Sequence, residues 1–143
     1  MPLSYEIDTK HRLVIAKGHG VLTYEDLIAY QTDVWSRREV LGFDEIVDVS
    51  DVDKIAYDSP RQVSALADHA ASLDSERETH LAIVAPDYGA YGLARMYQIF
   101  RGLQSKCPKK VEVFRSFDQA SLWIARERGL ACQARSVTEE PVK

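Results

Sequence analysis

The stretch His80-Leu81-Ala82-Ile83-Val84-Ala85 has five consecutive apolar residues and shows no alternation between polar and apolar side chains. A strand that is buried on both of its faces has this pattern, and such strands are typical of parallel sheets. Pro86 and Asp87 follow directly and end the strand. The stretch therefore predicts a central, parallel strand, and the rest of the fold can be worked out from it.

Helical patterns lie on both sides of this strand in the chain. Before it, Ser59 precedes Pro60 and is followed three residues later by Gln62, which is the pattern of a capping box with proline at the first helical position. We therefore expect a helix that starts after Ser59 and continues to Leu73. After the strand, apolar residues at helical spacing predict a helix over about residues 89–104.

The N-terminal part of the chain predicts a hairpin followed by a helix. Polar and apolar residues alternate over residues 3–7 and again over 13–17, which is the pattern of two half-buried strands joined by a turn. Thr23 is the expected N-cap of the next helix. Apolar spacing predicts this helix over residues 24–38, and Gly42 closes the segment.

Two further strands and a last helix complete an alternating order. The strands are expected over residues 46–49 and around 111–113, and the helix begins at Asp118. The order β-β-α-β-α-β-α-β-α is typical of an α/β fold, here with a mostly parallel mixed sheet of about five strands and four helices. We expect a single domain over residues 1–128 and a frayed C-terminal tail over 129–143.

The composition is that of an acidic globular domain. Eighteen Lys and Arg residues against 22 Asp and Glu residues leave a net charge of −4, so no basic excess indicates a nucleic-acid partner. The four histidines are few for a metal centre, and we expect neither a metal nor a cofactor. The longest apolar run, Leu81–Ala85, is far shorter than the roughly 20 residues that a membrane helix needs, so no membrane span is expected.

Two observations favour a cytoplasmic location. The first six residues contain neither the basic nor the apolar segment of a secretory signal. Cys107 and Cys132 do not form a C-x-x-C pair, and two thiols in a domain of this size fit a reducing compartment. Both cysteines are therefore expected to be free.

Three segments carry a resemblance to a known family. They are the strand end Asp48-Val49-Ser50, the helical segment Tyr91-Gly92-Leu93-Ala94-Arg95-Met96-Tyr97, and the segment 111–124, which reads VEVFRSFDQASLWI. Together with the opening hairpin they are similar to the SpoIIAA-like (STAS/SEC14-like) family of small bacterial proteins, over about residues 3–126. The resemblance implies the STAS fold and a protein that is not an enzyme. It further implies binding of a protein partner or, as for some members, of an apolar ligand.

The resemblance also implies a candidate phosphorylation site at Ser59. In STAS antagonists of anti-sigma factors, a serine at the start of the helix after the third strand is phosphorylated, and the added charge alters a surface that meets the partner. Asp58-Ser59 takes an equivalent place, although Pro60 and Arg61 replace the small residues of the family's signature. The spacing to Gln62 by itself favours another interpretation, in which Ser59 only caps its helix.

A second candidate surface lies where the chain enters the helix over residues 89–104. Open α/β sheets bind ligands at the carboxyl ends of their strands, and free backbone N–H groups at a helix N-terminus attract anions. The glycines here match neither a dinucleotide fingerprint nor a P-loop. The candidate ligand-binding or partner-binding residues of the two surfaces are Asp58, Ser59, Arg61, Tyr88, Gly89, Tyr91, Gly92 and Arg95.

The loop after the third predicted strand is acidic, with Asp48, Asp51, Asp53 and Asp58. Carboxylates at such spacing also occur in Mg²⁺ or Ca²⁺ sites and in receiver domains. A receiver needs further acids after its first parallel strand and a lysine after its last, and those places hold Gly18-His19-Gly20 and Phe114-Arg115. We therefore interpret the acids as solvated loop residues and helix caps.

The sequence thus predicts a non-enzymatic cytoplasmic protein that acts by binding a protein partner or a small apolar or anionic ligand. No Ser-His-Asp or Cys-His arrangement is evident, and no catalytic residue is expected. Two alternatives stay open, which are a carrier of small apolar, lipid-like molecules and a phosphoserine switch at Ser59. Assembly as a homodimer is compatible with each of them.

Overall fold

The predicted central strand is β6 (Thr79–Val84), whose six residues are all buried. In the computed structural model, which describes residues 2–104 and 106–139 and the side chains up to residue 129, β6 belongs to a five-stranded sheet of order β1-β2-β4-β6-β7. The other strands are β1 (Leu3–Asp8), β2 (Leu13–Gly18), β4 (Asp44–Asp48) and β7 (Lys109–Phe114). β1 and β2 run antiparallel and each other neighbouring pair is parallel, which confirms the predicted mixed sheet.

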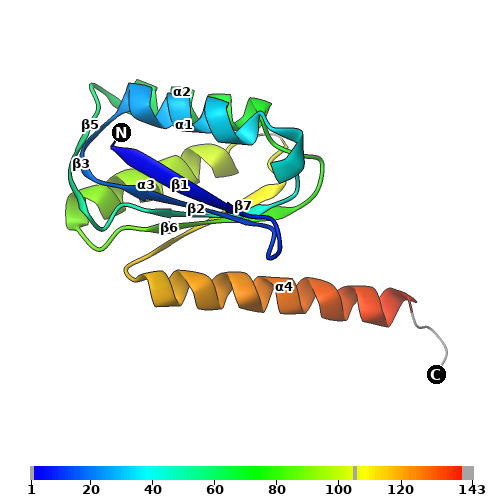
Figure 1. The fold of residues 1–143 in the computed structure, drawn as a ribbon. Coiled ribbons are helices and arrows are strands. Elements are labelled where there is room, and N and C mark those ends of the chain that lie inside the picture. Colours follow the sequence, from blue (N-terminus) through cyan, green and yellow to red (C-terminus); the bar gives the residue numbers. More distant parts are fainter. Residues whose placement is uncertain (1, 105, 140–143) are drawn as a thin grey trace.

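Helices cover both faces of the sheet (Figure 1). The helices α1 (Tyr24–Trp35), α2 (Pro60–Ser72) and α3 (Tyr88–Gly102) pack on one face, and a short 3-10 helix, η1 (Arg38–Val40), follows α1. The helix α4 (Phe117–Glu139) lies on the other face, where Ala120 and Ile124 pack on Ile46 and Ala82 of the sheet. None of the described helices is long and apolar enough to cross a membrane.

A small second sheet is missing from the sequence prediction. β3 (Gly20–Thr23) and β5 (Val52–Ala56) pair in parallel beside the main sheet. β3 follows β2 after the single residue His19, and Gly20 permits this break because its φ of 63° is one that glycine adopts freely. Runs of four or five residues carry too few periods to separate a strand from a loop, so the sequence alone predicts loops here.

The bounds of two helices differ from the prediction. α1 ends at Trp35 instead of residue 38, because the backbone of Arg37 is extended before η1 begins. The backbone of α4 continues to Glu139, into the segment predicted as a frayed tail from residue 129. Apolar periodicity fades there, but a helix that has already formed gains one hydrogen bond for each residue added. The division into a domain and a tail stays a prediction, and residues 140–143 lie outside the described part.

The two predicted N-caps have different outcomes. Thr23 caps α1 in a complete capping box, since its hydroxyl accepts from the Asp26 amide at 3.1 Å while the Asp26 carboxylate accepts from the Thr23 amide at 2.9 Å. Ser59 occupies the N-cap position of α2, yet its side chain makes no capping hydrogen bond. The capping box predicted there is wrong because the Gln62 side chain bonds instead to the backbone N–H of Asp58, at 2.7 Å.

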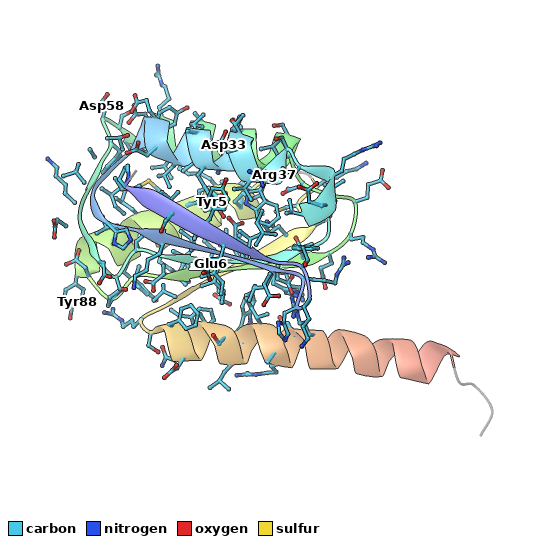
Figure 2. The ribbon with its side chains drawn as sticks, viewed as in Figure 1. Tyr5, Glu6, Asp33, Arg37, Asp58 and Tyr88 are labelled. Carbon is cyan, nitrogen blue, oxygen red and sulfur yellow. The ribbon has the colours of Figure 1, made fainter. Side chains whose placement is uncertain are left out.

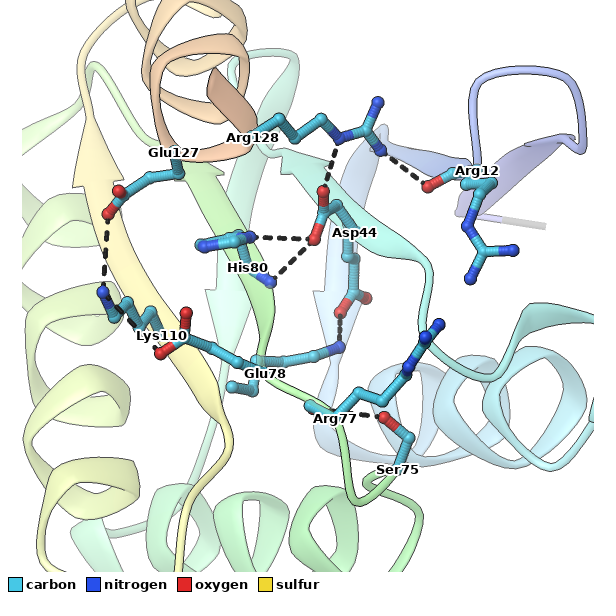
Figure 3. A network of polar contacts seen from close by, with 11 residues as sticks. Arg12, Asp44, Ser75, Arg77, Glu78, His80, Lys110, Glu127 and Arg128 are labelled. Carbon is cyan, nitrogen blue, oxygen red and sulfur yellow. Dashed lines mark hydrogen bonds and ion pairs between the residues drawn. The ribbon is translucent and has the colours of Figure 1, made fainter. Parts of the chain in front are cut away.

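A buried carboxylate joins α4 to the sheet (Figure 3). Asp44 of β4 accepts from the backbone N–H and the Nδ1 of His80 on β6, at 2.9 and 3.0 Å. Its second oxygen accepts from Nε of Arg128 on α4 at 2.7 Å, and Nη2 of the same arginine donates to the carbonyl of Arg12 at 2.8 Å. The ring of Trp123 on α4 meets His80 edge-on at 5.6 Å. The network thus fixes α4 to β4, to β6 and to the turn between β1 and β2.

The hydrogen bonds to Asp44 stabilise its negative charge. Burial by itself would raise the pKa of Asp44, but the hydrogen bonds from His80 and Arg128 outweigh burial and hold the pKa below its usual value. A carboxyl group with a lower pKa in the folded chain stabilises the fold above its unfolded pKa of about 4. This stabilisation is lost as the pH falls through the lower pKa of the folded state.

The caps lead to a first prediction. Thr23→Ala should lower the free energy of unfolding by about 1 kcal/mol, because it removes the capping hydrogen bond of α1. Ser59→Ala should cost less than about 0.5 kcal/mol, since no capping bond is lost. Urea unfolding followed by circular dichroism measures both, and equal losses for the two variants would contradict the difference in capping.

The Asp44 network leads to a second prediction. Asp44→Asn should lower the free energy of unfolding at pH 7 by about 3 kcal/mol, because Arg128 loses its charged partner beside a buried site. The variant should also lose less stability than the parent between about pH 5 and pH 3. Urea unfolding across this range is the measurement, and Asp68→Asn on the exposed side of α2 is the control. Parallel pH profiles for Asp44→Asn and the parent would exclude a stabilising charge at Asp44.

Candidate functional site

An apolar cavity of about 140 Å³ lies between the sheet and the helices α1, α2 and α3. Strands β4 and β6 form its floor, and the three helices form its walls. The residues that contribute most of the apolar lining are Leu27, Val47, Val63, Leu66, Ala70, Leu73, Leu81, Ile83, Leu93 and Ala94. Two lining residues are also at the surface, Leu41 after η1 and Tyr57 after β5, which are 47% and 42% exposed.

A buried ion pair stands in the wall of this cavity. Glu45 on β4 accepts from Nζ of Lys109 on β7 at 3.1 Å, and both side chains are more than nine-tenths buried. The other Glu45 oxygen accepts from the Tyr30 hydroxyl at 2.6 Å and from Nε1 of Trp35 at 3.0 Å. The Lys109 ammonium lies 4.0 Å from the centre of the Trp35 ring, which gives the lysine a second favourable contact. The carboxylate is therefore compensated by three donors from α1 and β7.

A second ion pair lines the same cavity. Nη2 of Arg101 near the end of α3 donates to Oδ1 of Asp74, which follows α2, at 2.8 Å. Arg101 is only 1% exposed, and its Nε and the second Asp74 oxygen, Oδ2, have no hydrogen-bond partner among the described residues. Burial lowers the pKa of the Arg101 guanidinium, but the hydrogen bond that it donates to Asp74 outweighs burial, so the arginine keeps its charge.

Tyr97 of α3 lies between the two pairs. Burial raises the pKa of its hydroxyl, and Arg101, Glu45 and Asp74 are all close enough to influence that pKa by charge. The Tyr97 hydroxyl makes no hydrogen bond to any side chain or backbone group in the described part of the chain. We call Glu45, Asp74, Tyr97, Arg101 and Lys109 the polar end of the cavity.

The parallel sheet explains where the polar end lies. Glu45 is the second residue of β4 and Lys109 is the first residue of β7, so both stand where parallel strands begin. Asp74 and Arg101 lie at the ends of α2 and α3, which run back toward that same edge. The polar end of the cavity thus lies at the amino ends of the strands. The site predicted from the sequence lies at the opposite, carboxyl ends of the strands.

The predicted candidate residues lie outside the cavity wall. Asp58 and Tyr88 are at one end of the molecule, beside the starts of α2 and α3 (Figure 2). Tyr88 is 84% exposed and lies with Tyr91 against the Arg115 guanidinium, 5.2 and 4.6 Å from it. The residues exposed at this end are Asp58, Arg61, Tyr88, Gly89, Gly92 and Arg95, and those half-buried are Ser59 and Tyr91. Their role in binding stays a prediction, as does phosphorylation of Ser59.

One premise of that predicted site is wrong. The sequence indicates free backbone N–H groups at the start of α3, but the Asp87 side chain caps this helix and accepts from the amides of Gly89 and Ala90 at 3.1 and 3.3 Å. A carboxylate already occupies the place that an anion would take. The surface at residues 88–92 is therefore not a free anion site.

Two acids of the loop, Asp48 and Asp51, have local partners. Asp48 accepts from the amide and the hydroxyl of Ser50, and Asp51 pairs with Lys17 at 3.1 Å. Among the residues that the structure describes, no three His, Cys, Asp or Glu side chains are grouped as a metal site. Cys107 is a free thiol that donates to the Lys109 carbonyl, and the side chain of Cys132 lies outside the described ones.

The residues of the polar end were not identifiable from the sequence as a group. Glu45 precedes the apolar residues of its strand and Lys109 precedes those of another, so both have the pattern of solvated strand ends. Tyr30 and Trp35 lie in the predicted helix 24–38, where an aromatic side chain has the pattern of an ordinary core residue. The sequence does contain one signal. Glu45 is two residues before the inward Val47, and Lys109 is two residues before the inward Val111. Residues two apart in a strand point to the same face, so Glu45 and Lys109 both face α1–α3.

Comparison with solved structures identifies the fold. The chain is similar to the crystal structure of an uncharacterised protein from the DUF3478 family with a SpoIIAA-like fold, from Shewanella loihica PV-4. The TM-score is 0.56 at 15% sequence identity, and the match covers 85% of this chain and 93% of that one. No family model matches the sequence, and no curated protein matches it. The SpoIIAA-like fold implied by the sequence resemblance is therefore confirmed.

The buried ion pair leads to a third prediction. Glu45→Gln keeps an acceptor for Tyr30 and Trp35 but leaves Lys109 without a counter-charge, and it should lower the free energy of unfolding by about 3–5 kcal/mol. Lys109→Met should lower the free energy of unfolding by a similar amount, because it leaves Glu45 without a counter-charge. The double variant should recover most of the loss, because no uncompensated charge remains buried.

Urea unfolding of the four proteins gives the coupling energy of this pair. Lys110→Met, on the next and exposed residue of β7, is the matched control and should change stability by less than about 0.5 kcal/mol. Additive losses in the double variant would show that Glu45 and Lys109 do not compensate each other.

Proposed function

We propose that this SpoIIAA-like chain is a binding protein that takes up a small apolar molecule in the cavity between its sheet and α1–α3. The observation that carries the proposal is the cavity itself, about 140 Å³ in volume and lined mainly by Leu, Ile, Val and Ala side chains. An apolar cavity of roughly 150 Å³ in a protein core binds benzene. A ring-sized or short-chain molecule therefore has the matching size and polarity.

The walls supply routes by which a ligand enters. Leu41 and Tyr57 are large apolar residues that line the cavity and are also exposed at the surface. Leu41 precedes β4 of the main sheet and Tyr57 follows β5 of the small sheet, so the two side chains belong to different parts of the wall. We propose that a ligand enters past one of these two side chains.

The proposal selects among the functions that the sequence leaves open. Binding of a small apolar ligand makes use of the apolar cavity between the sheet and α1–α3, and it needs no catalytic group. Both carboxylates that line the cavity form ion pairs with cationic side chains of this chain. Carboxylates that are already paired favour a binding site over a catalytic one. A cytoplasmic location belongs to the same proposal.

Cavity filling gives a fourth prediction. Toluene at ten times its dissociation constant should raise the melting temperature by about 3–5 °C, since a ligand that binds only the folded state stabilises it by mass action. Ala70→Leu adds three carbons to the wall of the cavity and should abolish this rise. Ala71→Leu adds the same atoms to the next residue of α2, outside the wall, and should keep it.

Calorimetry with and without toluene is the measurement. The proposal is overturned if toluene leaves the melting temperature of the parent unchanged, or if Ala70→Leu and Ala71→Leu respond alike. Solvent extraction and mass spectrometry of the purified protein should in addition reveal a co-purified apolar species.

A further inference from the structure

The polar end of the cavity holds more hydrogen-bonding capacity than the chain itself uses. The Tyr97 side chain lines the cavity, and its hydroxyl makes no hydrogen bond to the described residues. Arg101 Nε and Asp74 Oδ2 also have no partner among them, but both atoms are fully buried. The Lys109 ammonium carries three N–H groups, of which one meets Glu45 while another contact is with the Trp35 ring. A buried donor without a partner costs about 1–3 kcal/mol, so a ligand that accepts from it is favoured.

The charges of the polar end cancel. Glu45 and Asp74 carry formal negative charges, and each is paired at about 3 Å with a cation, Lys109 or Arg101. Each of these four side chains is about nine-tenths buried or more. A charged ligand group would bring an additional uncompensated charge into this apolar surrounding, which is strongly unfavourable.

The Glu45 oxygens are not available to a ligand, because Lys109, Tyr30 and Trp35 already donate to them. The unused groups on side chains that line the cavity are therefore donors, on Tyr97 and Lys109, because Arg101 Nε and Asp74 Oδ2 have almost no accessible surface. A ligand oxygen that accepts a hydrogen bond fits this set, and a hydroxyl oxygen also satisfies an acceptor.

From this geometry we propose that the ligand of the cavity is a small apolar molecule with a single neutral oxygen group, a hydroxyl or a carbonyl, which is held at the polar end by a hydrogen bond from Tyr97. This inference rests on the proposed function and specifies the chemical class of its ligand. The apolar part of the molecule lies against α2, α3 and β6, and its oxygen faces the edge at which β4 and β7 begin.

A matched series of four ring compounds tests the proposal, with toluene, benzyl alcohol, benzoate and benzylamine titrated into the full chain and followed by calorimetry or NMR. Benzyl alcohol should bind about fivefold more tightly than toluene, the gain of one hydrogen bond. Benzoate and benzylammonium should each bind at least about tenfold more weakly than benzyl alcohol, because each brings an unpaired charge into the cavity.

Variants of the polar end assign the effect to its residues. Tyr97→Phe should reduce the preference for benzyl alcohol over toluene to about onefold and change toluene binding by less than about twofold. Tyr91→Phe, on the same helix but outside the cavity wall, is the control and should keep the preference. Glu45→Gln should shift the ratio of benzoate to benzylammonium affinity toward benzoate by about tenfold or more, because one cation is then unpaired.

The outcomes separate the two proposals. If none of the four compounds binds, the proposed function is wrong. If toluene binds as tightly as benzyl alcohol, the cavity is a binding site but its polar end does not select an oxygen group, and a resident water satisfies Tyr97. A preference for benzoate or for benzylammonium in the parent protein, or a preference for the alcohol that survives Tyr97→Phe, likewise overturns the inference.

Discussion

Two neighbouring carboxylates on β4 join both helix layers to the sheet. Consecutive residues of a strand point to opposite faces, so Asp44 and Glu45 enter different layers although they are adjacent in the chain. Asp44 bonds to a histidine of β6 and an arginine of α4, and Glu45 bonds to two aromatic residues of α1 and a lysine of β7. A buried carboxylate is tolerated only when its oxygens are compensated, and this requirement determines which side chains stand opposite each acid.

The same requirement gives the cavity its two different ends. Toward the carboxyl ends of the strands the walls are aliphatic, and residues such as Val63 and Leu93 offer a ligand only dispersion contacts. Toward the amino ends, the opposite charges of Glu45 and Lys109 cancel, so this end of the cavity is polar but carries no net charge. Because the pairs are buried and compensated within the chain, the proposed ligand is selected by hydrogen bonding, and a charged group would gain nothing from them.

Much of the fold could be predicted from the sequence because its signals are local and periodic. The unbroken apolar run of β6, the alternation in β1 and β2, and the helical spacing of α1–α3 each indicate one element without reference to the rest. The prediction failed where few residues carry the pattern, as in β3 and β5, and where a side chain has a choice of partners. Gln62 could serve the cap of Ser59, yet it bonds to Asp58 instead. Such choices depend on geometry that spacing does not contain.

The sequence by itself determined the α/β class, the order of the four helices and the five strands of the main sheet, and the interior position of β6, because apolar burial and backbone period are properties of short segments. Only the tertiary structure decided that Glu45, Asp74, Tyr97, Arg101 and Lys109 meet at one end of a cavity. These residues come from two strands, a helix and the loop after another helix, and in the sequence each resembles an ordinary surface or core position. Whether a charge is buried depends on what packs over it, and that follows from contacts between segments up to 64 residues apart in the chain.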